Sequence, residues 1–197
     1  GGSGTDTLTF TDAGGATNEL NNVTTVETIT LGDAATNVTT VTALVTGTNT
    51  LTVSASALTG SNTLTWTGSA ETDGGKFSIT GSGQNDTIIG GSGADTIDGA
   101  AGNDSITAGT GDDSISGGNN DDTLVLGTNL TSADTIAGGS GTDTLTFTDA
   151  GGATNDLDNV TTVETITLGN AATAVTTVDG LVASGATLTV DGSALSG

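Results

Sequence analysis

The chain has 197 residues and a formal net charge of −22, because 23 acidic side chains face one basic side chain, Lys76. This charge argues against nucleic acid or an anionic membrane surface as a partner and favours a cation. With no cysteine and no histidine, disulfides and Cys- or His-based nucleophilic triads are excluded. The sequence shows no apolar run long enough to span a bilayer and no signal peptide.

Residues 1–80 are predicted to form the looser coils of a stacked β structure, because the 45 threonines of the chain favour strands over helices. Short alternating segments predict strands at 7–11, 27–31, 38–45, 50–53, 63–67 and 76–80. Leu8, Ile29 and Leu51 are 21 and 22 residues apart, which suggests equivalent positions in successive coils with a second strand about halfway. Trp66 is expected to fill the core.

Residues 81–125 repeat one nine-residue phrase five times: GSGQNDTII, GGSGADTID, GAAGNDSIT, AGTGDDSIS and GGNNDDTLV. The opening small residues predict a tight turn, and the last three residues of each phrase predict a short strand with its middle aliphatic side chain pointing inward. Such a strand buries nothing alone, so the phrases must stack on one another. A disordered acidic linker would not need an aliphatic residue at every ninth position. Aspartate holds the sixth place of every phrase: Asp86, Asp95, Asp104, Asp113 and Asp122.

Stacking brings the aspartates into columns that repel one another unless a cation neutralises them. The ligands available there are carboxylate and turn carbonyl oxygens, which suit Ca²⁺ better than zinc or copper. The glycines predicted to expose these carbonyls are Gly81, Gly83, Gly90, Gly93, Gly99, Gly102, Gly109, Gly111 and Gly117.

The phrase GGSGADTID, residues 90–98, resembles the GGxGxDxUx nonapeptide of the RTX family without a mismatch. The resemblance implies an all-β, right-handed parallel β-solenoid, with two phrases per coil and several Ca²⁺ ions held between successive turns. It further implies that Asp86, Asp104 and Asp122 line one edge, and Asp95 and Asp113 the other.

Residues 126–137 predict an irregular turn, because three extra residues precede NLTSADTIA, which keeps Asp134 but lacks glycines. Residues 138–197 match residues 1–60 at 47 positions, so the repeating unit has 137 residues and the chain reads as an excerpt of a longer array. Asp6 and Asp143 open the two copies as further calcium ligands. Glu27 and Glu164, in the shared segment VETITL, are expected to be solvated edge residues that could also complete calcium sites.

The aspartates occupy equivalent environments, whereas acid–base catalysis needs carboxyls with different pKa values, so no enzymatic activity is expected. The TLTF and TTVETITL segments resemble RTX-containing S-layer proteins. That resemblance implies a secreted cell-surface structural protein, exported unfolded by type I secretion, that self-assembles into a filament or lattice on binding calcium. Two alternatives stay open. One is an ice- or surface-binding adhesin region using the Thr-x-Thr pairs, whose drifting spacing argues against a regular array; the other is a secretion and folding module of an enzyme.

Overall fold

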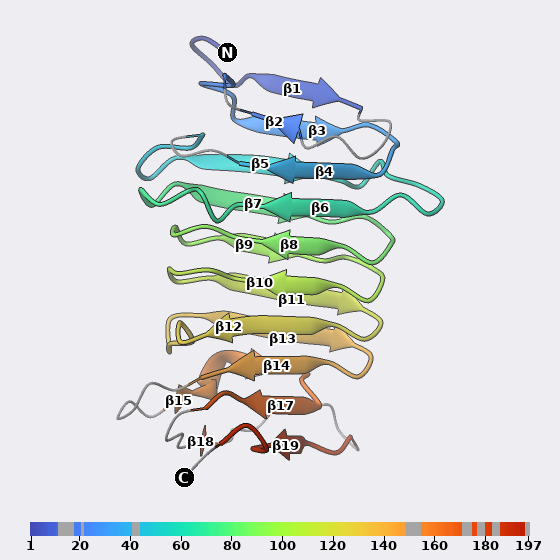
Figure 1. The fold of residues 1–197 in the computed structure, drawn as a ribbon, viewed down its shortest axis with the longest axis vertical. Helices are drawn as coiled ribbons and strands as arrows, with labels where there is room; N and C mark the ends of the chain where they lie inside the picture. Colours follow the sequence, from blue (N-terminus) through green and yellow to red (C-terminus); the bar gives the residue numbers. More distant parts are fainter. Residues whose placement is uncertain are drawn as a thin grey trace.

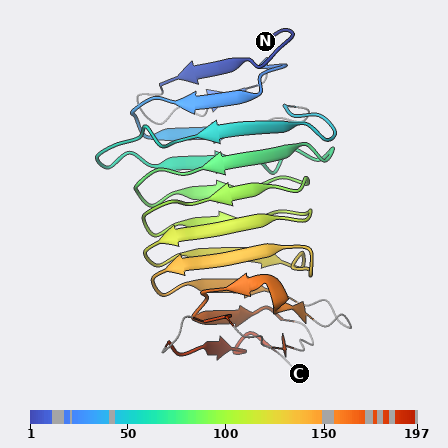
Figure 2. The ribbon, with the colours of Figure 1, turned by 180° about the vertical axis from the view of Figure 1, so that it is seen from behind.

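The computed structural model describes residues 1–11, 18–20, 22–40, 44–148, 155–170, 175–176, 180–182 and 186–195. Its strands stack along one long axis as two facing parallel sheets (Figures 1 and 2). From residue 7 to residue 147 the described strands alternate between the two sheets, so each of these coils contributes one strand to each sheet. The all-β parallel solenoid predicted from the sequence is therefore confirmed.

The first sheet has eight strands, all paired in parallel. They are β1 (Thr7–Phe10), β3 (Thr28–Leu31), β5 (Thr50–Ser54), β7 (Lys76–Thr80), β9 (Thr96–Asp98), β11 (Ser114–Asn119), β13 (Thr135–Ser140) and β16 (Val160–Thr161). The second sheet has nine. They are β2 (Asn18–Glu19), β4 (Thr36–Thr39), β6 (Leu64–Thr67), β8 (Thr87–Ile89), β10 (Ser105–Thr107), β12 (Thr123–Gly127), β14 (Thr144–Phe147), β17 (Thr165–Leu168) and β19 (Thr189–Asp191). A small third sheet pairs β15 (Asn155–Asp156) with β18 (Val175–Thr176), and one 3₁₀ turn, η1, spans Leu157–Asn159.

The core between the two sheets is a narrow double column of inward side chains. Because side chains alternate along a strand, the three-residue strands β8, β9 and β10 each bury only their middle residue, as the pattern predicted. The column of the first sheet runs through Ile29, Val53, Ile79, Ile97, Ile115 and Ile136. Trp66 is fully buried, as expected, and packs edge-on against Phe77 with ring centroids 5.4 Å apart.

The looser coils differ from prediction in their register. Leu8 pairs with Ile29 as expected, but Ile29 pairs with Val53 and not with Leu51, whose partner is Phe77. The prediction was wrong by two residues because Leu51 and Val53 both point inward, so alternation alone does not distinguish them. The strand predicted at 38–45 ends earlier, at Thr39; its residues 41–43 lie outside the described part of the chain.

The three inserted residues after Val125 are absorbed where β12 passes into the following loop. Ile115 pairs with Ile136 across 21 residues, whereas Ile97 pairs with Ile115 across 18. The segment predicted as an irregular turn also contains the end of β12 and the start of β13.

The two copies of the 137-residue unit begin on different sheets. The first strand of the first copy is β1 in the eight-stranded sheet, and the equivalent strand of the second copy is β14 in the nine-stranded sheet. Equivalent residues of the two copies therefore face opposite sides of the solenoid.

Outward hydroxyl side chains form one ladder in register on each sheet, although the spacing of the Thr-x-Thr pairs drifts in the sequence. Loops of different length absorb the drift, and the strands stay aligned. On the nine-stranded sheet one ladder runs through Thr65, Thr87, Ser105, Thr123, Thr144, Thr165 and Thr189. On the eight-stranded sheet another runs through Thr7, Thr28, Thr52, Ser78, Thr96, Ser114 and Thr135.

Candidate metal centre

Two columns of aspartates run along the solenoid at the point where each turn enters its strand. In each column the backbone amide of one aspartate donates to Oδ1 of the aspartate in the next coil, at 2.7–2.9 Å. One column contains Asp86, Asp104, Asp122 and Asp143, and the other contains Asp95, Asp113 and Asp134. This is the division between two edges that the family resemblance implied.

These seven carboxylates are buried, and none is more than 2% exposed. Burial is costly for a charged group, and it raises the pKa of Asp104 to about 7 and of Asp95, Asp113 and Asp122 to about 6. Repulsion from the acidic neighbours acts in the same direction and opposes the backbone amides that stabilise the charged forms. The pKa of Asp143 is also raised, first by burial and then by Glu164.

Three of the columns' buried oxygens are unpaired. Oδ2 of Asp104, Asp122 and Asp143 has no hydrogen-bond partner within the described part of the chain. At three other positions Oδ2 has a donor: the Ser82 amide for Asp86, the Gly91 amide for Asp95 and the Thr131 amide for Asp134. An unpaired buried carboxylate oxygen is expensive, so the three mark places where a cation would stabilise the fold.

Beside each unpaired oxygen lies a backbone carbonyl of the next coil. A Cβ added at Gly99 would collide with both Asp104 Oδ2 and the Gly117 carbonyl oxygen. One added at Gly117 would meet Asp122 Oδ2 and the Gly138 carbonyl oxygen in the same way. The glycine that opens a nonapeptide therefore leaves a space into which a carboxylate and a carbonyl oxygen both face.

The donor set fits Ca²⁺, which takes hard oxygen ligands from carboxylates and backbone carbonyls. Among the described residues, no group of three His, Cys, Asp or Glu side chains could hold a metal ion. The ligands on offer in the columns are therefore Asp Oδ2 atoms and turn carbonyls. When bound, Ca²⁺ would supply positive charge beside the carboxylate oxygens that no amide satisfies.

The predicted glycines fall into three groups. Gly81, Gly90, Gly99 and Gly117 border the space beside an aspartate, and the carbonyls of Gly99 and Gly117 face it. Four others have their Cα packed against backbone of the preceding coil, away from the aspartates: Gly93, Gly102, Gly109 and Gly111. Gly83 faces open space. Whether any of them binds a metal ion stays a prediction.

Some residues of the columns were missed or undervalued in the sequence. The Ala108 carbonyl lies beside Asp95, in the space that Gly90 leaves. The sequence pattern could have indicated Ala108, because it is the first residue of the phrase AGTGDDSIS. Asp134 continues its column, because its Oδ1 accepts from the Asp113 amide at 2.7 Å. The expectation of solvated edge positions for Glu27 and Glu164 was wrong, since both are half-buried and accept from the amides of Asp6 and Asp143.

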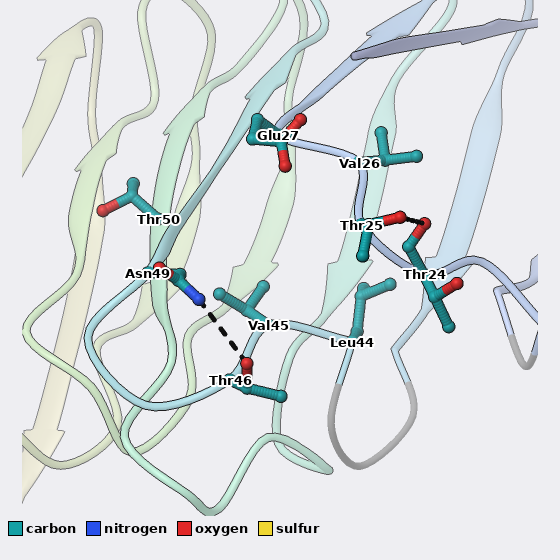
Figure 3. A pocket seen from close by; sticks show the side chains of 9 residues that line it. All are labelled: Thr24, Thr25, Val26, Glu27, Leu44, Val45, Thr46, Asn49 and Thr50. Atoms are coloured by element: carbon teal, nitrogen blue, oxygen red, sulfur yellow. Dashed lines mark hydrogen bonds between the residues drawn. The ribbon is translucent and has the colours of Figure 1, made fainter. Parts of the chain in front are cut away.

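A cavity of about 390 Å³ lies between the coil at 24–27 and the coil at 44–50, where the register of the looser coils changes (Figure 3). Its lining is formed by Thr24, Thr25, Val26, Glu27, Leu44, Val45, Thr46, Asn49 and Thr50. Glu27 is the single titratable side chain among them, so the cavity has no pair of carboxyls for acid–base chemistry.

Without calcium, the fold is expected to become less stable as pH rises from about 4 to about 7. Asp95, Asp104, Asp113 and Asp122 have folded-state pKa values near 6 to 7, above the unfolded value of about 3.9. The folded chain thus binds more protons in this window, and that stabilisation is lost as pH rises. Thermal unfolding in chelator should give a lower Tm at pH 7.5 than at pH 4.5. A Tm that rises with pH in chelator would contradict the burial of these groups.

Two open-ended parallel sheets with buried, carbonyl-flanked aspartate columns define a calcium-type β-solenoid. A family model described as the RTX calcium-binding nonapeptide repeat (4 copies) matches residues 78–106, 99–128 and 131–147. These segments are RTX calcium-binding nonapeptide repeats stacked in a β-solenoid, and Ca²⁺ is the ligand of such repeats. Neither the curated proteins nor the solved structures that were searched gave a match. In the described part of the chain, no helix is long and apolar enough to cross a membrane.

Proposed function

We propose that this chain is a section of the calcium-dependent structural repeat of a bacterial cell-surface protein, such as an S-layer protein, a matrix fibre or an adhesin stalk. The observation that carries the proposal is the unbroken stacking of one 137-residue unit on the next. Strand β14, which opens the second copy, pairs with β12 in the same parallel way as strands within a unit. The aspartate column also crosses the boundary, because the Asp122 amide donates to Asp143 Oδ1 at 2.8 Å.

A tandem array built in this way forms one continuous rod. The rod has a narrow core, and the chain has no cysteine for disulfide bonds, so calcium is the means of cross-linking the coils. Export into millimolar calcium would favour folding outside the cell, because a ligand that binds the folded state stabilises it by mass action. RTX repeats are typical of secreted proteins, which supports an extracellular location.

The start of the two copies on opposite sheets supports lateral assembly. Successive units would present the same surface on opposite sides of the rod, so that one kind of contact can recruit neighbours on both sides. Equivalent carboxylates in a ladder, and a cavity with one titratable side chain, also favour a structural role over catalysis.

The purified chain in millimolar calcium is expected to associate into filaments or sheets, which dynamic light scattering and negative-stain electron microscopy would detect. Chelator should disperse them. A chain that binds calcium and folds but stays monomeric at every concentration would reject the assembly role and favour the alternative of a secretion and folding module. Labelling of intact cells with antibody against this chain would test the surface location.

A second candidate is an ice- or surface-binding adhesin region. The observation that favours it is the register of the outward hydroxyl ladders on both sheets, with strands at about 4.8 Å spacing. The neighbouring ladder on the nine-stranded sheet is interrupted at Ile89, Val125 and Asp191. Thermal hysteresis of a calcium-loaded solution would support ice binding, and its absence would rule that candidate out.

A further inference from the structure

The two broad faces of the solenoid carry almost no charge. On the nine-stranded sheet, no outward residue of β4, β6, β8, β10, β12, β14 or β17 is charged. On the eight-stranded sheet, the broad side seen in Figure 2, the outward residues of β1 to β13 include one positive and one negative charge, on Lys76 and Asp98. The net charge of −22 is therefore carried mainly by the turns at the two edges.

These edges oppose contact between two copies of the chain. Their turns expose Asp33, Asp73, Asp112 and Asp121 to solvent. Two copies that met edge to edge would bring like charges together, which is unfavourable at an interface. Contact through a broad face avoids this repulsion.

The eight-stranded face also presents short side chains in two adjacent columns. Beside the hydroxyl ladder described above, a second column in register contains Thr9, Thr30, Ser54, Thr80, Asp98, Ser116 and Ala137. On the nine-stranded sheet the corresponding column is interrupted by the larger side chains of Ile89 and Val125. A face of short, neutral side chains allows a second sheet to approach to the usual spacing of packed sheets, about 10 Å.

The two charges of this face cannot satisfy each other within one copy. Asp98 pairs with Thr80, which lies four residues after Lys76 in β7. The two charges are therefore about 13 Å apart along the strand direction, on neighbouring strands. A twofold axis between two such faces, passing midway between Lys76 and Asp98, exchanges the two positions. It would place each lysine opposite the aspartate of the other copy, as a self-complementary twofold interface requires.

We propose that the eight-stranded face is a self-association surface that packs against the same face of a second copy, with Lys76 of each copy paired with Asp98 of the other. The charge pairs set the orientation of the two copies more than they set the affinity. In a tandem array whose units begin on opposite sheets, the surface recurs on both sides of the rod, so that many weak contacts add up.

This inference rests on the self-assembly in the proposed function and names the surface that mediates it. Carbodiimide treatment of the whole chain in millimolar calcium tests the surface directly, because it joins an amine and a carboxylate in contact as an amide, with loss of water. Lys76 is the one lysine of the chain, so a link from a lysine side chain identifies its own surroundings. Mass spectrometry of the covalent dimer should find Lys76 of one copy joined to Asp98 of the other.

Lys76→Glu replaces each attraction across the twofold axis with a repulsion. Sedimentation velocity in calcium should show the dissociation constant of self-association rise at least about tenfold. The double variant with Lys76→Glu and Asp98→Lys exchanges the two signs and should restore association. Thr107→Glu is the control, because it adds a negative charge to the outward side of β10 on the other face and should leave the dimer unchanged.

Association that is the same in native protein and Lys76→Glu, or links from Lys76 to turn residues such as Asp112, would overturn the inference while leaving self-assembly intact. Such results would indicate contact through turns bridged by calcium. A native chain that folds with calcium and stays monomeric at every concentration would reject the assembly role and this surface together. If a variant does not fold, as judged by circular dichroism in calcium, the cross-link in the native protein decides.

Discussion

Removal of calcium with a chelator is expected to abolish most of the β signal in the far-ultraviolet circular dichroism spectrum at neutral pH. The physical reason is the set of unpaired carboxylate oxygens of Asp104, Asp122 and Asp143. A ligand at 100 times its Kd stabilises a fold by about 2.7 kcal/mol per site, so three such sites contribute about 8 kcal/mol. That is comparable with the whole stability of a typical domain, which is about 5–15 kcal/mol.

Magnesium at the same concentration is the control for this experiment, because it demands a tighter octahedral shell and gives up its waters reluctantly. Magnesium should restore little of the signal, and readdition of calcium should restore it fully. A spectrum that stays β-rich in chelator at pH 7.5 would show that the columns tolerate their charge without an ion.

Gly117→Ala is expected to destabilise the calcium-loaded protein strongly. The added methyl group would meet Asp122 Oδ2 and the Gly138 carbonyl oxygen, which are the two atoms proposed to hold an ion. Overpacking costs about 1–3 kcal/mol, and the loss of one ion would add to it. Thermal unfolding at fixed millimolar calcium and a calcium titration would measure the two contributions.

Gly83→Ala is the matched control, because a Cβ at Gly83 meets no atom within 4 Å. It should leave calcium binding unchanged and shift stability by at most about 1 kcal/mol, in the stabilising direction if it reduces the freedom of the unfolded chain. Equal losses in the two variants would show that the Gly117 effect arises from the turn in general and not from the space beside Asp122.

The nonapeptide part of the fold could be predicted because its fixed nine-residue period allows one stacking register. In each nine-residue phrase, the aspartate at position six fixes the columns and the aliphatic residue at position eight fixes the core. Loops of constant length keep Ile97 paired with Ile115. In the looser coils the loops vary, so the sequence did not determine whether Leu51 or Val53 stacks on Ile29. Strand alternation, the signal available there, is the same for both residues.

The burial of the column aspartates and the backbone conformation of Thr162 could not be predicted for a different reason. A column of aspartates in a sequence indicates a charged edge. In the structure the carboxylates are buried and accept hydrogen bonds from backbone amides of the neighbouring coil. The left-handed conformation of Thr162 contradicts the residue's own preference, so no propensity would indicate it. At Thr162, where local preference fails, the structure places a carbonyl beside the Asp143 carboxylate.

Anomalous diffraction from crystals grown in millimolar calcium tests the central claim most directly. We expect peaks in the spaces beside the column aspartates, first between Asp104 Oδ2 and the Gly117 carbonyl oxygen. An ordered solenoid with the same stacked turns and no anomalous peak in either column would contradict the account.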